Sequence, residues 1–97
     1  MSDVVHAAER SRFEIVEGEH RAVLTYVRTD DQVVLEHTVV PPELGGRGLG
    51  SDLARAALEW AREQGLAVVP QCTFVQSFLA KHPEVTESVT LRQARGV

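Results

Sequence analysis

The chain has 97 residues, of which 43% are hydrophobic and 25% are charged, and such a composition is typical of one folded domain. Its single cysteine, Cys72, excludes an internal disulfide and fits a reducing cytoplasm, and we find no signal peptide and no apolar run long enough for a membrane span. The net charge of −4 disfavours nucleic acid as a partner, because phosphate binding needs a basic surface. An acidic surface favours a cationic substrate such as an amine, or serves only to keep the protein soluble.

The first half of the chain predicts β-strands. Residues 1–10 are polar and lack a clear period, so we expect a loose tail there. Short β-rich runs at residues 13–15 and 23–27 flank the turn-forming Gly18 and predict a hairpin. A nearly continuous apolar run over residues 33–40 predicts a central strand, which Pro41 and Pro42 end.

The second half predicts helices around one more strand. Apolar residues recur at three- and four-residue spacing over residues 49–64, which predicts a helix that Gly65 ends. Residues 66–74 predict a strand, in which Pro70 marks an edge, a bulge or a place where neighbouring strands diverge. We expect a short helix at residues 75–81 and a frayed or weakly helical tail after it. This order indicates an α+β sheet, with antiparallel strands followed by a crossover between parallel strands.

The loop before the main predicted helix is dense in glycine. Glycine accepts positive φ and lets backbone N–H groups approach a ligand, and the following helix directs its positive end at the same place. The loop therefore predicts an anion site whose natural occupant is a pyrophosphate, with a tight structural turn as the alternative. A Walker A loop is excluded because Gly50 is followed by Ser51 and Asp52 without a lysine. The loop also differs from the dinucleotide-binding fingerprint, because it lacks the final glycine spacing and the parallel strands of that motif.

Taken with segments further along the chain, this loop resembles that of the GNAT N-acetyltransferases, Arg/Gln-x-x-Gly-x-Gly/Ala. The resemblance to small, single-domain GNAT-like acetyltransferases covers about residues 13 to 90. Gly45 stands where the wider superfamily has Arg or Gln, whereas Gly48 and Gly50 match. The segments that carry the resemblance are Glu36-His37-Thr38, Gly46-Arg47-Gly48-Leu49-Gly50, Val69-Pro70-Gln71-Cys72 and His82-Pro83-Glu84.

The resemblance implies one α+β domain over residues 1–97, in which antiparallel β-β-β is followed by an α-β-α crossover and strands splay around a coenzyme A cleft. It implies an acetyl-CoA-dependent N-acetyltransferase that acts on a primary amine of a small molecule or protein, with acetyl-CoA as co-substrate and no metal. The alternatives are a coenzyme A binding module with little or no turnover and an interaction domain with an incidental glycine turn. The implied cofactor contacts are Val39, Val40, Gly45, Gly46, Arg47, Gly48, Leu49, Gly50, Ser51, Phe74 and Ser77. Arg47 either reaches a phosphate oxygen or is only an exposed loop charge.

Cys72 and His37 are the candidate catalytic residues. The Cys72 thiolate could accept the acetyl group or act as a weak base, and the alternative is a buried structural cysteine. His37 is a candidate general base or a hydrogen-bonded core histidine, and strand alternation puts it on the face opposite Glu36 and Thr38. The only tyrosine, Tyr26, does not match the position of the family's usual general acid, so the proton would come from water, Cys72 or Ser77.

Overall fold

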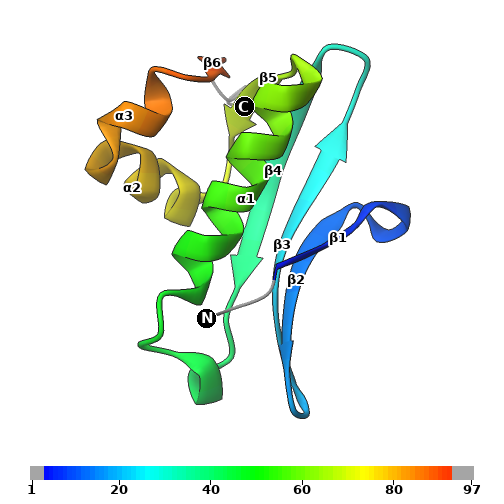
Figure 1. Cartoon of the computed structure of the whole chain (residues 1–97), viewed down its shortest axis with the longest axis vertical. Helices are drawn as coiled ribbons and strands as arrows, with labels where there is room; N and C mark the ends of the chain where they lie inside the picture. Colours follow the sequence, from blue (N-terminus) through cyan, green and yellow to red (C-terminus); the bar gives the residue numbers. More distant parts are fainter. Residues whose placement is uncertain (1–3, 93–97) are drawn as a thin grey trace.

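The frame of the molecule is a six-stranded sheet with the strands in the order β1-β2-β3-β4-β5-β6 (Figure 1). The computed structural model of the chain describes residues 4–92. Strands β1 to β4 pair antiparallel, whereas β5 runs parallel to both β4 and β6. The strand bounds are β1 Val5–Ala7, β2 Arg12–Glu17, β3 His20–Arg28, β4 Gln32–Val39, β5 Ala67–Pro70 and β6 Thr90–Leu91.

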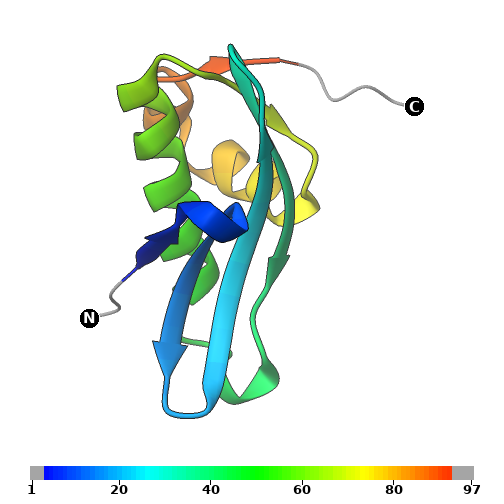
Figure 2. The ribbon, with the colours of Figure 1, turned by 90° about the vertical axis from the view of Figure 1, so that its right-hand side faces the viewer.

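The helices follow the antiparallel strands. Helix α1 spans Leu49–Gln64, as its apolar spacing predicts, and ends at Gly65, which adopts a left-handed φ of 70°. Helix α1 connects the parallel strands β4 and β5, and both α1 and α2 pack on one face of the sheet (Figure 2). The other helical segments are η1 Ala8–Arg10, η2 Pro42–Leu44, α2 Thr73–Lys81 and α3 Pro83–Thr86.

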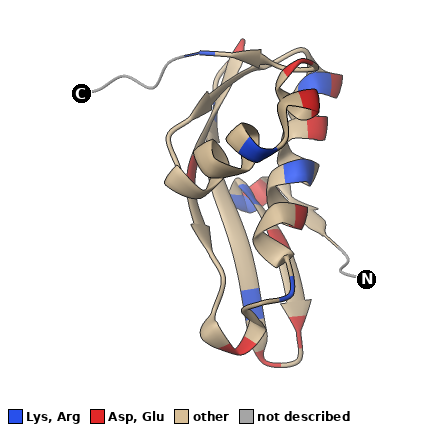
Figure 3. Ribbon diagram, turned by 90° about the vertical axis from the view of Figure 1, so that its left-hand side faces the viewer, with Lys and Arg blue, Asp and Glu red and all other residues tan. Residues whose placement is uncertain are grey.

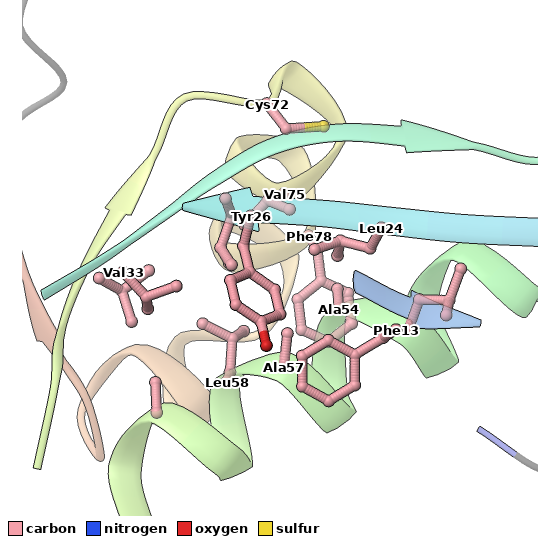
Figure 4. Packing of buried hydrophobic residues seen from close by; sticks show 14 of the residues in the cluster. Phe13, Leu24, Tyr26, Val33, Ala54, Ala57, Leu58, Cys72, Val75 and Phe78 are labelled. Carbon is pink, nitrogen blue, oxygen red and sulfur yellow. The ribbon is translucent and has the colours of Figure 1, made fainter. Parts of the chain in front are cut away.

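The hydrophobic core lies between α1, α2 and the sheet face that they cover (Figure 4). Alternate residues of β2, β3 and β4 point into it, and α1 contributes the stripe of side chains that its sequence period predicts. This packing fixes the start of α1, and with it the glycine loop, against the end of β4. The fully or nearly fully buried side chains include Phe13, Ile15, Leu24, Tyr26, Val33, Leu35, Leu53, Ala54, Ala57, Leu58, Val75 and Phe78.

Three sequence expectations about the elements were wrong. The tail expected at residues 1–10 is ordered from Val5, because β1 pairs with β2 and His6 stacks on Phe13 with ring centroids 4.2 Å apart. The strand expected at residues 66–74 ends at Pro70, and α2 begins at Thr73 rather than at residue 75. The helical part of the C-terminal tail is present as α3, but the tail also contains β6, an unexpected short strand that pairs parallel with β5.

Among residues 4–92, no helix has the length and apolar character to cross a membrane.

Candidate functional site

The glycine loop presents its backbone amides to an open hollow. Gly46 and Gly48 have φ of +79° and +75°, and neither would bring a Cβ within 4 Å of another atom. The 3-10 turn η2 fixes the start of the loop through the amides of Leu44 and Gly45, which bond to the carbonyls of Pro41 and Pro42. From residue 46 to residue 51, the backbone amides find no acceptor within the described part of the chain, and Asp52 is the first residue of α1 whose amide is bonded. The N-terminus of α1 therefore offers a row of free donors.

The hollow in front of these amides has a volume of about 290 Å³. Phe74, from the first turn of α2, closes one side, and its ring lies so close to Gly50 that a Cβ there would be 2.6 Å from Cζ. Phe74 nevertheless keeps 40% of its surface exposed. A side chain larger than glycine at position 50 would therefore displace the Phe74 ring from its present place. The lining residues are Val40, Leu44, Gly45, Gly46, Gly48, Leu49, Gly50, Ser51 and Phe74.

Three residues of the expected cofactor set lie outside this hollow, and one of them, Val39, lines the second hollow described below. Arg47 forms an ion pair with Glu17 at the end of β2, and its side chain does not line the hollow. Ser77 is exposed on α2 and lines neither this hollow nor the one described next. The expected set is otherwise gathered around the loop and the end of β4.

Strands β4 and β5 diverge beside the loop. They pair from Gln32↔Ala67 to Leu35↔Pro70, and the Leu35 carbonyl then accepts from the amides of Gln71 and Cys72 at 3.1 and 2.9 Å. Beyond Leu35, β4 stays paired with β3 as far as Val39, but no described strand pairs with its other edge. The side-chain amide of Gln76 donates to the Pro70 carbonyl at 2.8 Å and so stabilises the turn by which residues 70–72 leave the sheet. The splay that Pro70 and the resemblance predicted is therefore present.

A hollow of about 360 Å³ occupies the gap between the diverging chains. It is lined by Glu36, His37, Thr38, Val39, Gln71, Cys72 and Thr73. Val39 lines this hollow and Val40 lines the hollow of the glycine loop, so consecutive residues of one segment border both spaces. An elongated ligand can thus contact the loop and the splay together.

A β-bulge in β4 decides which side chains face inward at the splay. Tyr26 of β3 pairs with Leu35 and Thr25 pairs with His37, so Glu36 has no partner and the alternation reverses. His37 is consequently exposed, which excludes the alternative of a core histidine, whereas the half-buried Thr38 lies opposite the buried Leu24. His37 and Thr38 therefore line the hollow from opposite faces of β4.

Cys72 lies directly before α2, not on a strand, and only 7% of its surface is exposed. Figure 4 shows it beside β4 at the margin of the buried cluster. Its Sγ is 3.2 Å from Thr38 Oγ1. Burial raises the pKa of the Cys72 thiol, but hydrogen bonds from the Thr38 hydroxyl and from backbone N–H groups at the start of α2 outweigh burial, so the pKa is lowered overall. Cys72 thus lies at the edge of a ligand-sized hollow with a thiol pKa below its ordinary value.

Tyr26 belongs to a different part of the molecule. Its hydroxyl is 2.6 Å from His6 Nε2, and its ring packs against Trp60 with centroids 5.0 Å apart. Both residues border a hollow that shares no residue with the glycine loop or the splay. The structure thus agrees with the sequence in keeping the only tyrosine away from Cys72.

Sequence reasoning missed several residues that shape the site. It gave no role to Thr38, whose hydroxyl lowers the Cys72 pKa, or to Gln76, which secures the turn after Pro70. It also missed Glu17 as the partner of Arg47. A polar residue within an apolar strand was a usable signal for Thr38, whereas the contacts of Glu17 and Gln76 join segments with no local pattern in common.

Comparisons with known proteins agree with this geometry. The model of a family described as GCN5-related N-acetyl-transferase matches residues 12–89. Curated relatives called Protein NATD1 include those from Bos taurus and Homo sapiens, which are 37% and 36% identical over 83 residues, or 82% of this chain and 74% of each relative. The relative of the same name from Danio rerio is 34% identical over 91 residues, which cover 89% of this chain and 83% of that protein. The chain therefore belongs to the family of GCN5-related N-acetyltransferases.

Proposed function

We propose that this protein binds acetyl-CoA and transfers its acetyl group to a primary amine of a small molecule or protein. The observation that carries the proposal is the divergence of β4 and β5 directly beside a loop of unbonded backbone amides. In acetyl-CoA, the diphosphate requires hydrogen-bond donors such as the loop amides, and the amide-containing pantetheine arm next to it requires an open strand edge such as that of β4. The acidic net charge of −4 agrees with an ammonium-bearing acceptor.

The diphosphate of the substrate would be held by the amides of residues 46–51. Positive φ at Gly46 and Gly48 keeps these amides directed outward, and the positive end of the α1 dipole adds to the attraction for an anion. Because the cradle is made of backbone, we expect it to depend on loop conformation more than on any one side chain. Arg47, engaged with Glu17, contributes little in this arrangement unless the ion pair opens.

The pantetheine arm would lie in the splay. Residues 36–39 have a free strand edge, and the amide groups of the arm can pair with such an edge as an added strand does. Val39 and Val40 supply apolar contacts where the arm leaves the loop. This position brings the thioester toward Cys72 and Thr38.

Cys72 is our candidate nucleophile, because a lowered pKa raises the fraction of thiolate near neutral pH. Its Sγ attacks the thioester carbonyl, the bond from that carbonyl to the coenzyme sulfur breaks, and coenzyme A leaves as a thiolate that takes a proton from water. The acceptor amine then attacks acetyl-Cys72, and the Cys72 sulfur departs as a thiolate. His37, exposed in the same hollow, accepts the proton that the amine releases.

A coenzyme A binding module with little turnover is the second candidate. It is favoured by the location of Tyr26, which is bonded to His6 and does not line the splay. In that case acetyl-CoA binds with the affinity that the loop provides, but no acetyl-enzyme forms and no acceptor is modified. The single free cysteine fits the cytoplasm as the compartment for either function.

The deciding experiment incubates the protein with acetyl-CoA, first without and then with a panel of amines and peptides, and records intact mass and free thiol release. Acetyl transfer predicts one acetyl group on the wild type, none on Cys72→Ala, and thiol release that rises with an accepted amine. Binding by calorimetry without acetylation or thiol release supports the binding module. Absence of binding contradicts both functions.

A further inference from the structure

Arg55 and Lys81 are cations that the acyl-transfer site does not use. Neither has a carboxylate oxygen within 4 Å among residues 4–92, and both are exposed. Several other arginines, namely Arg10, Arg12, Arg47 and Arg92, are paired with acidic side chains. In an acidic protein, free cations on neighbouring helices are available to bind an anion.

Their position relates them to the glycine loop. Arg55 follows Ser51 by four residues, so it lies on the same face of α1, about 6 Å further along the helix axis. Its guanidinium carbon is 5.4 Å from the centre of the Phe78 ring on α2. Lys81 is three residues beyond Phe78 and shares its side of α2. Arg55 therefore contacts Phe78 one helical turn from the proposed diphosphate cradle, and Lys81 lies about two turns beyond Phe74, the residue of α2 that borders the hollow.

The opposite side of the loop is acidic. Arg47 is already paired with Glu17, and His20 Nδ1 lies 3.9 Å from Glu43 Oε1. Glu19 adds another carboxylate to the same hairpin turn. Figure 3 shows acidic segments at the tip of the β2–β3 hairpin and at η2, whereas acidic and basic segments alternate along α1 and a basic segment lies on α2. A second phosphate group on a ligand held at the loop would be repelled by the carboxylates on the hairpin side, and the first cation that it meets along α1 is Arg55.

We infer that Arg55 and Lys81 bind the ribose 3′-phosphate of coenzyme A and make the site select coenzyme A over its 3′-dephospho form. The inference rests on the proposed function, because it places the diphosphate on the loop and the pantetheine arm in the splay. The nucleotide end must then leave the loop on the other side from the splay. The Arg55 guanidinium can contact phosphate oxygens in a bidentate manner, and the Lys81 ammonium adds a mobile point charge.

The test is calorimetric titration of coenzyme A and of 3′-dephospho-coenzyme A into the wild type, Arg55→Gln, Lys81→Gln and the control Arg62→Gln. Arg62 is also exposed on α1 and has no carboxylate oxygen within 4 Å among residues 4–92, but it lies two turns beyond Arg55. We expect the wild type to bind coenzyme A at least about tenfold more tightly than the dephospho form, since a hydrogen bond to a charged group contributes about that factor. Arg55→Gln and Lys81→Gln should each reduce this ratio without weakening the dephospho form, and Arg62→Gln should leave the ratio unchanged.

The outcomes separate the two proposals. Equal binding of both ligands by the wild type overturns the role of Arg55 and Lys81 and leaves the proposed function intact. A ratio that survives both substitutions, or that Arg62→Gln lowers as much as they do, also overturns it. Binding of neither ligand contradicts the proposed function and this inference together.

Discussion

Helix α1 offers a matched pair of glycines with which to test the anion cradle. Gly48 precedes the helix with φ 75° and ψ 18°, and Gly65 follows it with φ 70° and ψ 27°. At neither position would a Cβ meet another atom within 4 Å. The substitutions Gly48→Ala and Gly65→Ala therefore introduce the same left-handed strain at opposite ends of one helix, and only one of them lies in the proposed site.

The expected costs follow from this geometry. A left-handed alanine costs about 1–2 kcal/mol, so both variants should lose about that much free energy of unfolding, as measured by urea denaturation. Gly48→Ala should also weaken acetyl-CoA binding by at least about tenfold, or ~1.4 kcal/mol. If the new alanine keeps the left-handed conformation, its methyl group enters the ligand space. If it relaxes to negative φ, the amides that follow turn away from the ligand.

Calorimetry with acetyl-CoA provides the comparison. Gly65→Ala should bind acetyl-CoA as the wild type does, despite its equal loss of stability. Equal affinities for Gly48→Ala and the wild type would refute the cradle, because the amides around residue 48 would then have no role in binding. Equal weakening in both variants would show that affinity follows stability rather than loop geometry.

Other predictions concern the cleft and the core. Thr38→Val removes the hydroxyl donor to Cys72 and should raise the pKa of that thiol, measured as the pH dependence of thiolate absorbance; an unchanged pKa contradicts the role given to Thr38. Burial raises the pKa of Glu14, but the hydrogen bond from Arg12 and the nearby arginine charges lower it overall. The ionised Glu14 therefore stabilises the fold above its unfolded pKa, and this stabilisation is lost as pH falls through its folded pKa. Glu14→Gln should accordingly make Tm less dependent on pH in the acid range. An unaltered Tm–pH profile would contradict this role of Glu14. Leu53→Ala should cost about 2–5 kcal/mol of unfolding free energy in urea, because Leu53 is fully buried, and a loss below about 1 kcal/mol would show that the core collapses around the gap.

The sequence predicted those parts of the fold that have a local cause. The bounds of α1 follow from its apolar period and from Gly65, and the hairpin from the β-rich runs on either side of Gly18. The end of β5 was placed too late because residues 71–74 have β-type side chains, yet Pro70 cannot continue the ladder. β1 and β6 are short and gain their stability from pairing with neighbours, which no local pattern records.

For the site, sequence alone predicted the loop and the splay but not the arrangement of side chains. The bulge at Glu36 reverses the alternation of β4, so an uninterrupted period from Leu35 would have placed His37 inward and Thr38 outward. The alternation of side chains along one strand cannot predict such a bulge, because the bulge depends on how the partner strand pairs. Arg47 was similarly expected at phosphate, whereas its pairing with Glu17 depends on the packing of η2 and the hairpin.

The central claim is that backbone amides at residues 46–51 and the free edge of β4 hold one extended thioester substrate. Amide-resolved NMR during titration with coenzyme A tests this claim most directly. We predict that the largest shifts fall on residues 46–51 and on residues 37–39, while Tyr26 and Trp60 remain unaffected. Shifts confined to the hollow beside Tyr26 and Trp60, or no shifts at millimolar ligand, would contradict the account.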